Sequence, residues 1–452
     1  MVVLGNPPYS VSSSNKGECI ENLMDTYKEA VRDERNIQPL SDDYIKFIRF
    51  AHDRIERTGS GIVAMITNHV FLSGLIHRGM REELINCFDE IYITNLHGNA
   101  ILKETTPEGN KDENVFDIRQ GVAISFLVKY PKSTKNTHVF YRDFWGSRDL
   151  KYEMLNDAEL DSMDWNQISS IHPFYFFVPK DFSVFEEFNK YFAIEKLFTI
   201  NSHGVKTHRD HFAINNDPKI LLNRISDLLD DNKSIDRIRN TYSLNDTRDW
   251  SLREARKLLK TDINWNGRVK NYLYRPFDIK SIYFSSIILE LPRLNIMQHI
   301  VKNNIALLLG RAGHAVQSKQ WNLAFVSKNL VDTNIFRRGG GTVIPIYIYP
   351  DINKERLFDS TSISPWEPDP NHGNRVPNLD PGFVTNMETK LVLTFDPHLT
   401  GREHTIEDTF GPEDILAYIY AVFHSPAYRS RYAEFLKIDF PRVPLTSDAD
   451  LF

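Results

Sequence analysis

Apolar residues follow two different patterns in the first 130 positions. Some short runs are continuously apolar, as expected for buried strands, whereas other segments repeat apolar residues every three or four positions, as helices do. The pattern predicts strands at 2–5, 61–67, 90–96 and 121–128, and helices at 18–35, 41–59 and 77–87. Strands that alternate with helices predict a doubly wound sheet with helices on both faces.

The pattern changes after residue 129. Residues 151–182 include an aromatic, proline-rich passage, IHPFYFFVPKD, that suits a domain junction. Periodic apolar segments then continue to the end, including helical stripes at 415–423 and 428–436, so the remainder is too apolar for disorder. We expect a first domain at 1–150, a linker at 151–182 and a second domain at 183–452.

A stiff turn follows the first predicted strand. Asn6, Pro7, Pro8 and Tyr9 come directly after the apolar run, where the strand reaches its carboxyl edge. Ligands of open α/β sheets bind at that edge. Because the two prolines fix φ and remove two backbone donors, the carbonyls of this turn are free to face a ligand.

These four residues suit methylation of an exocyclic amine. An adenine amino group is a poor nucleophile, and the Asn6 side-chain oxygen and the Pro7 carbonyl can accept its two hydrogens while Tyr9 stacks on the base. The base would first have to be flipped out of a duplex. The alternative is a turn that only ends the strand, as Asn-Pro pairs often do.

The tetrapeptide resembles motif IV of the amino-methyltransferases, which methylate adenine or cytosine amines with S-adenosylmethionine. Some release-factor glutamine methyltransferases carry the same four residues, so the motif alone leaves the substrate open. The passages GIVAMITNHVFL and IYITNLHGN resemble the following strands of N6-adenine methyltransferases, and NVFDIRQGVAISFLV resembles motif VIII. That last resemblance implies that Phe116 stacks on the second face of the base; the alternative is a core aromatic.

The cofactor motif of this family is not found in the sequence. It would be a strand followed by a Gly-containing turn, and in this subclass it precedes the Asn-Pro-Pro-Tyr block. Gly339 to Gly341 and Gly310 to Gly313 are poor substitutes because their surroundings do not match. We therefore expect the S-adenosylmethionine site upstream of Met1, so that the chain is a fragment, and we find no Walker A motif.

The second part resembles the target-recognition region of Type ISP restriction-modification enzymes, the single-polypeptide Type I-like class. The matching passages are SHGVKTHRDHFAI, YLYRPFDIKSIYF, LPRLNIMQHI and FGPEDILAYIYAVFHSPAYRSRYAEFLKIDFPRVPL. The resemblance implies nuclease, helicase-like and cofactor-binding regions upstream, in cis or in trans, and double-stranded DNA as partner.

Polar residues in predicted loops of the second part are candidate DNA contacts. Arg, Asn and Gln can bind base edges, Lys mainly binds phosphate, and most such residues are ordinary surface groups. The candidates are Lys206, His208, Arg209, Arg275, Arg293, Arg311, His314, Gln317, Asn334, Arg337 and Arg338. The last two precede three glycines, which permit close backbone approach to phosphate.

Other features of the sequence argue against a metal site and a membrane-spanning segment. His69 and His97 end predicted strands without a carboxylate or Cys at metal-ligand spacing, so we expect no metal site. Cys19 and Cys87 are the two cysteines, which fits a reducing cytoplasm. No apolar run approaches the roughly 18 residues that span a bilayer, and the net charge of -6 leaves room for a local basic cleft.

Together these observations predict an α/β chain: a partial doubly wound S-adenosylmethionine-dependent methyltransferase sheet without its first strands, then a mixed α/β target-recognition domain. The predicted function is site-specific adenine-N6 DNA methylation and target recognition in a cytoplasmic restriction-modification system. The alternatives are a DNA-recognition module without its own catalysis and a protein glutamine methyltransferase.

Overall fold

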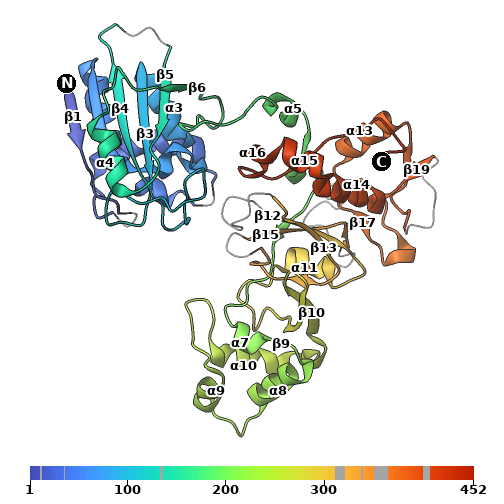
Figure 1. The fold of residues 1–452 in the computed structure, drawn as a ribbon. Helices are drawn as coiled ribbons and strands as arrows, with labels where there is room; N and C mark the ends of the chain where they lie inside the picture. The colour runs from blue at the N-terminus through green and yellow to red at the C-terminus, as the bar shows by residue number, and fades with distance from the viewer. Residues whose placement is uncertain are drawn as a thin grey trace. The chain divides into compact units, whose positions relative to one another are not determined.

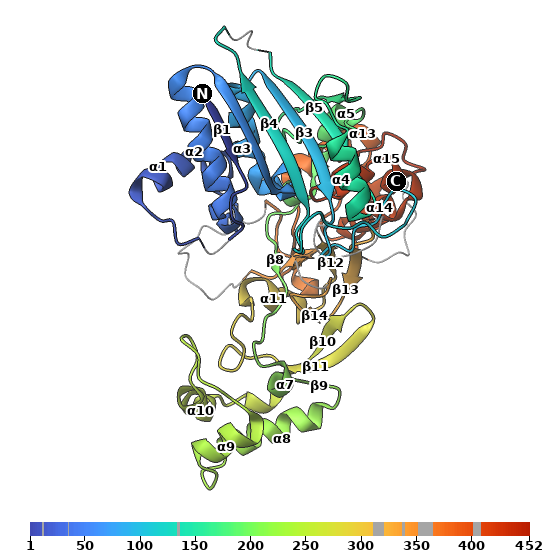
Figure 2. The same ribbon diagram turned by 60° about the vertical axis from the view of Figure 1, so that its left-hand side comes forward.

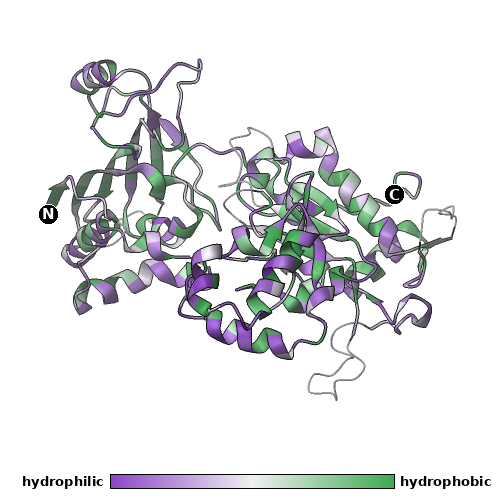
Figure 3. Cartoon of the chain, turned by 90° about the horizontal axis from the view of Figure 1, so that it is seen from below, coloured by the Kyte–Doolittle hydropathy of each residue, from purple (hydrophilic) through white to green (hydrophobic). Residues whose placement is uncertain are grey.

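The computed structural model divides the chain into two compact units, Met1–Asp181 and Phe182–Phe452, which are described separately (Figure 1). The residues that the structure describes are 1–10, 13–34, 36–132, 136–310, 321–336, 340–350, 365–400 and 408–452. In both units the helices carry alternating hydrophilic and hydrophobic bands (Figure 3), as expected when one side of a helix packs on a core.

The first unit is built on a six-stranded sheet of order β1-β2-β4-β3-β5-β6. Its strands are β1 (Val2–Gly5), β2 (Gly61–Asn68), β3 (Glu90–His97), β4 (Val122–Lys129), β5 (His138–Asp143) and β6 (Asn166–Ile168). β1 pairs parallel to β2 and β3 parallel to β5, and β4 runs antiparallel between β2 and β3. Hence β1, β2, β3 and β5 all point the same way, and their carboxyl ends meet at one edge.

Helices cover the two faces of this sheet unequally. Residues of α1 (Glu18–Lys28), α2 (Asp43–Thr58) and α3 (Arg78–Cys87) form one core with alternate residues of β2 to β5. On the opposite face, α4 (Arg148–Asn156) packs on a smaller cluster that includes Leu96 and Val122 (Figure 2). The structure therefore confirms a mixed α/β chain.

The first strand is exposed, although its apolar run predicted a buried one. Val2 is 65% exposed and Leu4 is 73% exposed, and only Val3 packs on the core. β1 is the edge strand, and no described element covers the face on which Val2 and Leu4 lie. A continuous apolar run indicates a strand that is buried on both sides only if other elements cover both faces of the sheet.

Residues 151–181 belong to the first unit and do not form the expected linker. They contain most of α4, and β6 extends the sheet by pairing with β5. Phe177 is fully buried in the same core as the helices. The aromatic and proline-rich passage, interpreted as a junction, is instead held by Arg81, whose guanidinium donates to the Phe174 and Tyr175 carbonyls.

The second unit is a mixed fold with one large hydrophobic core. Its helices are α5 (Phe185–Asn189), α6 (Ile194–Leu197), α7 (Asp210–Ala213), α8 (Pro218–Leu229), α9 (Ile235–Tyr242), α10 (Leu252–Thr261), α11 (Leu294–Ile300), α13 (Pro381–Leu391), α14 (Pro412–His424), α15 (Pro426–Arg431) and α16 (Ala433–Leu436). The stripe predicted at 415–423 is confirmed as the buried side of α14. The helix predicted at 428–436 is interrupted at Tyr432, which separates α15 from α16.

Two four-stranded sheets organise the second unit. One has the order β14-β10-β11-β9 and the other β13-β12-β15-β8. Their strands are β8 (Ser202–His203), β9 (Ile214–Asn215), β10 (Val269–Arg275), β11 (Asp278–Tyr283), β12 (Ala306–Gly310), β13 (Ala324–Ser327), β14 (Leu330–Val331) and β15 (Gly341–Pro345). Three small pairs complete the unit: β16 (Tyr347–Ile348) with β17 (Val376–Pro377), β18 (Thr394–Phe395) with β19 (Thr409–Phe410), and β7 (Phe192–Ala193) with β20 (Arg442–Val443).

Candidate functional site

The carboxyl edge of the first sheet gathers side chains from four parallel strands. Asn6 follows β1, His69 follows β2, His97 ends β3 and Asp143 ends β5. This edge is where open α/β sheets bind ligands. The topology thus places the turn after β1 and the two histidines on the same side of the sheet.

The turn after β1 presents a polar group on a fixed backbone. Pro7 is buried, whereas Asn6 and Pro8 are exposed. The chain after it is anchored to the start of α2, because the Ser10 amide donates to Asp42 Oδ1 at 2.7 Å. The side-chain amide of Asn6 is therefore available to a ligand, and the buried Pro7 ring fixes the position of the turn.

Tyr9 offers an aromatic face and an uncharged hydroxyl. Its ring is half-buried and meets the Tyr44 ring edge-on, with centroids 6.0 Å apart. Burial, followed by the nearby Asp42 carboxylate, raises the pKa of Tyr9 to about 12. The hydroxyl is buried and has no hydrogen-bond partner among the described residues. Tyr9 can act through its ring and is poorly suited to proton transfer.

Phe116 lies in the long segment between β3 and β4. It is half-buried and packs on the cluster formed with Leu96 and Val122, while Tyr9 packs on the other core of the unit. The described contacts do not join Phe116 to Tyr9. Its backbone is fixed, because its amide donates to Asn114 Oδ1 at 2.8 Å and its carbonyl accepts from Arg148.

A buried ion pair holds the segment that carries Phe116. Lys151 Nζ lies 2.8 Å from Asp112 Oδ2, and both side chains are fully buried. The Asp112 carboxylate also accepts from the Gly98 and Gly146 amides at 2.7 and 2.8 Å. Hence the segment from Gly98 to Gly121 is tied to α4 and to the end of β3.

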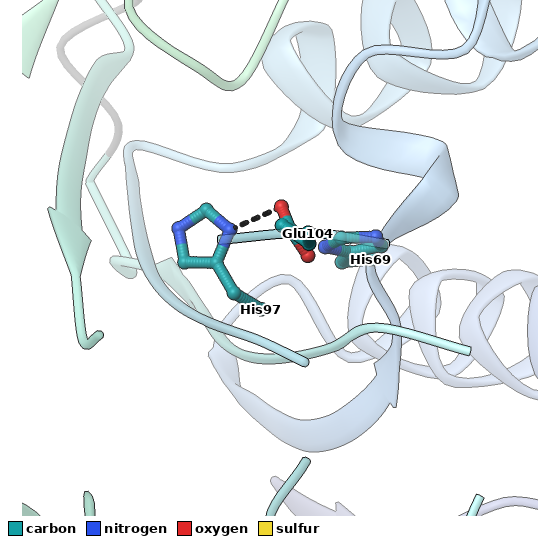
Figure 4. Close-up of side chains that lie close together, drawn as sticks. All are labelled: His69, His97 and Glu104. Atoms are coloured by element: carbon teal, nitrogen blue, oxygen red, sulfur yellow. Dashed lines mark hydrogen bonds and ion pairs between the residues drawn. The ribbon is translucent and has the colours of Figure 1, made fainter. Parts of the chain in front are cut away.

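His97 is the centre of a hydrogen-bonded group at the carboxyl edge (Figure 4). Its Nδ1 lies 2.8 Å from Glu104 Oε1, and its Nε2 lies 2.6 Å from Asp143 Oδ1. The ring also stacks on Trp145, with centroids 3.3 Å apart. Burial alone would lower the pKa of His97, but the Asp143 and Glu104 carboxylates outweigh burial and raise it.

His69 and Glu104 complete this group. His69 Nδ1 lies 3.1 Å from Asn95 Oδ1, and its Nε2 lies 3.2 Å from Asn99 Nδ2. Burial lowers the pKa of His69 and favours the neutral ring. One donor atom from each of His69, His97 and Glu104 lies within 4.8 Å of the other two, so these three described residues could hold a metal ion.

The sequence interpretation of these histidines requires a correction. No carboxylate was recognised at metal-ligand spacing, yet Glu104 reaches His97 from the loop and Asp143 reaches it from β5. The His97 backbone has a positive φ of 52°, and a bulge interrupts the pairing of β3 with β4 there. Six residues of irregular loop separate His97 from Glu104, so no periodic pattern in the sequence indicates that they meet.

In the second unit, four separate stretches of chain meet at one place, which we call the loop junction. It comprises residues 204–209, 288–293, 331–334 and Arg275. Lys206 and Leu291 exchange two backbone hydrogen bonds at 3.0 Å, and the Val205 amide donates to the Val331 carbonyl at 2.7 Å. Gly204 is required for this approach, because a Cβ there would lie 2.5 Å from the Asp332 backbone.

Several of the predicted DNA contacts lie at the loop junction. Lys206 and Asn334 are exposed, and the Arg275 side chain is 38% exposed. Arg293 is half-buried and stands at the N-cap position of α11, where its side chain makes no capping hydrogen bond. Residues more than 120 positions apart thus present polar groups at the same junction.

Arg209 differs from these residues because it is only 4% exposed. Its guanidinium lies 3.8 Å from the centroid of the Trp250 ring and donates to the Ile288 carbonyl at 2.8 Å. Glu290 lies 3.7 Å from it and 2.7 Å from His208 Nδ1. This environment favours a structural role for Arg209 over the DNA contact expected from sequence.

An exposed aromatic side chain near these residues was not singled out from sequence. Phe277, at the turn between β10 and β11, is 90% exposed and has a φ of 64°. Residues other than glycine rarely adopt such a φ, and strained residues cluster at functional sites. The Arg-Pro-Phe-Asp passage between two alternating strands is the signal that would have identified it.

The remaining candidates from sequence lie outside the described residues. These are Arg311, His314, Gln317, Arg337 and Arg338. In the described part of the chain, no helix combines the length and apolar character needed to cross a membrane.

Comparison of structures shows the same fold in three solved structures. The "ATP-dependent Type ISP restriction-modification enzyme LlaBIII bound to DNA" matches with a TM-score of 0.68 and 23% identity, over 98% of this chain and 28% of that one. The DrdV–DNA complex matches with a TM-score of 0.65 and 23% identity, over 99% of this chain and 43% of that one. The nuclease-deletion mutant of the Type ISP enzyme LlaGI, solved with a DNA substrate mimic, matches with a TM-score of 0.61 and 22% identity, over 98% and 40%.

The chain therefore spans less than half the length of each of these three proteins. A search of curated protein sequences found no match. The family model of the Type ISP C-terminal specificity domain matches residues 196–452, which is more than half of the chain. The resemblance to Type ISP enzymes predicted from sequence is confirmed, and the chain belongs to the family of the Type ISP C-terminal specificity domain.

Proposed function

We propose that this chain recognises a DNA sequence and holds a flipped adenine for N6 methylation within a restriction-modification enzyme. The observation that carries the proposal is the loop junction, which lies in the part of the chain matched by the specificity-domain model. The DNA complexes of the three similar proteins support a DNA partner.

The loop junction has the chemistry needed to bind DNA. Lys206 is exposed and has no ion pair among the described residues, which suits contact with a phosphate. Arg275 forms an ion pair with Asp332 at 3.0 Å. The backbone amide of Asn334 donates to the same carboxylate, which leaves the Asn334 side chain free to face DNA. Arg and Asn side chains on a fixed backbone can bind base edges in the major groove.

The carboxyl edge of the first sheet has groups suited to an adenine amine. Asn6 supplies an exposed amide oxygen and Pro7 a carbonyl on a buried ring, so the two can accept the two amine hydrogens. Tyr9 supplies an uncharged ring that Tyr44 supports. Phe116 is proposed to reach the other face of the base.

S-adenosylmethionine is the methyl donor that the resemblance implies, but the described residues do not fit it. A nucleoside cofactor would need an open glycine turn after a parallel strand. Gly98, after β3, is covered by Asn114, and Gly146, after β5, is covered by Leu150. We therefore assign no cofactor contact to the described residues and expect the cofactor-binding, helicase-like and nuclease regions in cis or in trans.

DNA recognition is tested by measuring the affinity of the whole chain for a library of duplexes at several salt concentrations. Lys206→Ala is expected to weaken binding to all sequences and to lower the salt slope by about 1. Asn334→Ala is expected to relax sequence preference. Lys219→Ala, at an exposed position on α8, is the matched control. Salt slopes that do not differ between Lys206→Ala and the control would contradict a phosphate contact at the loop junction.

Methylation is tested with labelled S-adenosylmethionine, duplex DNA and the chain supplemented with a cofactor-binding region of a Type ISP enzyme. Asn6→Ala is expected to lower N6-methyladenine formation by about 10²–10³-fold, because an acceptor aimed at the reacting amine is lost. DNA affinity should not change. Equal methylation by both proteins would refute the role of Asn6, and methylation of glutamine in place of adenine would favour the protein methyltransferase alternative.

A further inference from the structure

We propose that His69, His97 and Glu104 form a binding site for one divalent transition-metal ion of the zinc class. The three donor atoms lie within 4.8 Å of one another at the carboxyl edge of the first sheet (Figure 4). Two imidazoles and a carboxylate are ligands that zinc and its neighbours accept, at bond lengths of about 2.0–2.2 Å. This inference is independent of the proposed DNA methylation.

The hydrogen bonds around the two histidines leave one nitrogen of each ring for the metal. His69 Nδ1 donates to Asn95 Oδ1, so its Nε2 carries the lone pair and accepts from Asn99 Nδ2. His97 Nε2 donates to Asp143 Oδ1 at 2.6 Å, which leaves Nδ1 toward Glu104. Metal-binding histidines in proteins almost always donate their other ring N–H to a carboxylate or carbonyl.

Further hydrogen bonds hold the groups that contact the three proposed ligands. Asn95 also donates to the Tyr141 hydroxyl at 2.9 Å, and that hydroxyl donates to Asp143, so the two outer partners are linked. The backbone amide of Asn99 donates to Glu104 Oε2 at 3.0 Å, which orients the carboxylate. Gly121 leaves room for the His69 ring, because a Cβ there would lie 2.3 Å from it.

Metal binding would need only small changes. Tetrahedral bonds of about 2.1 Å place ligand atoms about 3.4 Å apart, so the present 2.8 Å between His97 Nδ1 and Glu104 Oε1 would open slightly. The ion would replace the proton between those two atoms and displace the Asn99 side-chain amide from His69. A fourth position would remain for water.

The position of the site defines what the ion would do. His69 follows β2, His97 ends β3 and Glu104 lies in the segment that carries Phe116. A metal ion would therefore join two strand ends to that segment. We infer an ion that fixes the segment from Gly98 to Gly121, and we assign it no step in the methyl-transfer chemistry.

The test is metal binding by the whole chain after treatment with a chelator and dialysis. Titration with Co²⁺ is expected to give one tight equivalent with the visible absorption of a nitrogen- and oxygen-ligated ion, and Zn²⁺ should displace it. Glu104→Gln and His69→Gln should each lower Zn²⁺ affinity by more than about 100-fold. Asp143→Asn, which removes only an outer partner, should lower it by about 10-fold.

His372→Asn is the matched control: His372 pairs with Asp369 at 2.5 Å and His398 lies 3.9 Å from the same carboxylate, but among the described residues this group does not bring three donor atoms close enough to hold a metal ion. It should bind one equivalent like the wild type. Unchanged affinity in both Glu104→Gln and His69→Gln, or the absence of a tight equivalent in the wild type, would refute the site. If those variants do not fold, X-ray absorption of the zinc-loaded wild type decides: two imidazole ligands support the proposal and none overturns it.

Discussion

Asp332 and Arg275 form an ion pair, with 3.0 Å between Oδ1 and Nη1, where the segments of the loop junction meet. The Asp332 side chain also accepts from the Tyr272 hydroxyl and from the backbone amide of Asn334, each at 2.6 Å. Asp332 is only 4% exposed. One buried carboxylate therefore positions two of the residues proposed to contact DNA.

Asp332→Ala is expected to destabilise the second unit by about 2–4 kcal/mol, because it leaves the buried Tyr272 hydroxyl without its acceptor and removes the ion pair with Arg275. Urea unfolding measures the change. Asp278→Ala is the control, since the Asp278 side chain is 46% exposed and pairs with Lys280 at 3.6 Å, and its effect should stay within about 0.5 kcal/mol. Equal effects of the two substitutions would show that Asp332 does not organise the junction.

Arg209→Gln is expected to lower stability without changing the salt dependence of DNA binding. The substitution removes the stack on Trp250 and the bond to the Ile288 carbonyl, at a cost of about 2–3 kcal/mol. Salt slopes of the folded variant and of Lys206→Ala should be compared at one temperature. A slope reduced as much as in Lys206→Ala would mean that Arg209 contacts phosphate.

Tyr9→Phe is expected to maintain or increase stability, because the buried hydroxyl that it removes has no hydrogen-bond partner among the described residues. Its ring would still stack on a base, so methylation in the supplemented assay should be retained. Tyr9→Ala removes the ring and should lose stacking worth about 1–3 kcal/mol per base. Loss of methylation in Tyr9→Phe would assign the hydroxyl a role that its environment does not suggest.

The first unit is expected to lose stability as the pH falls below 6.5. Burial, then the charges of Arg49 and Lys129, lowers the pKa of His52 to about 3, and its Nδ1 lies 3.0 Å from the Tyr27 hydroxyl. Between pH 6.5 and 3 the unfolded chain binds a proton at this ring that the folded chain does not. The free energy of unfolding therefore falls by about 1.4 kcal/mol per pH unit from this group.

His52→Gln should reduce that slope by the contribution of one proton. Denaturant unfolding of the first unit at pH 7.5, 6.0 and 5.0 provides the measurement. A slope equal to that of the wild type would mean that His52 is protonated in the folded protein or that its ring is not buried in solution.

The sequence by itself determined the local elements of this protein and the position of its most informative turn. The stripe that predicts a helix at 41–59 corresponds to α2, and the runs at 61–67 and 90–96 correspond to β2 and β3. These predictions succeed because spacing along the chain records which side of an element is buried. Asn6 to Tyr9 were located by the same local logic, since a strand that stops at two prolines must end there.

Only the tertiary structure decided which side chains meet. His97 acquires Glu104 and Asp143, Arg209 is buried against Trp250, and Asp332 holds Arg275, all across irregular or distant segments. β1 is exposed and residues 151–181 join the first unit, because burial depends on which elements cover a face and not on the apolar run alone. Long-range packing of this kind leaves no period in the sequence, whereas a helix or strand does.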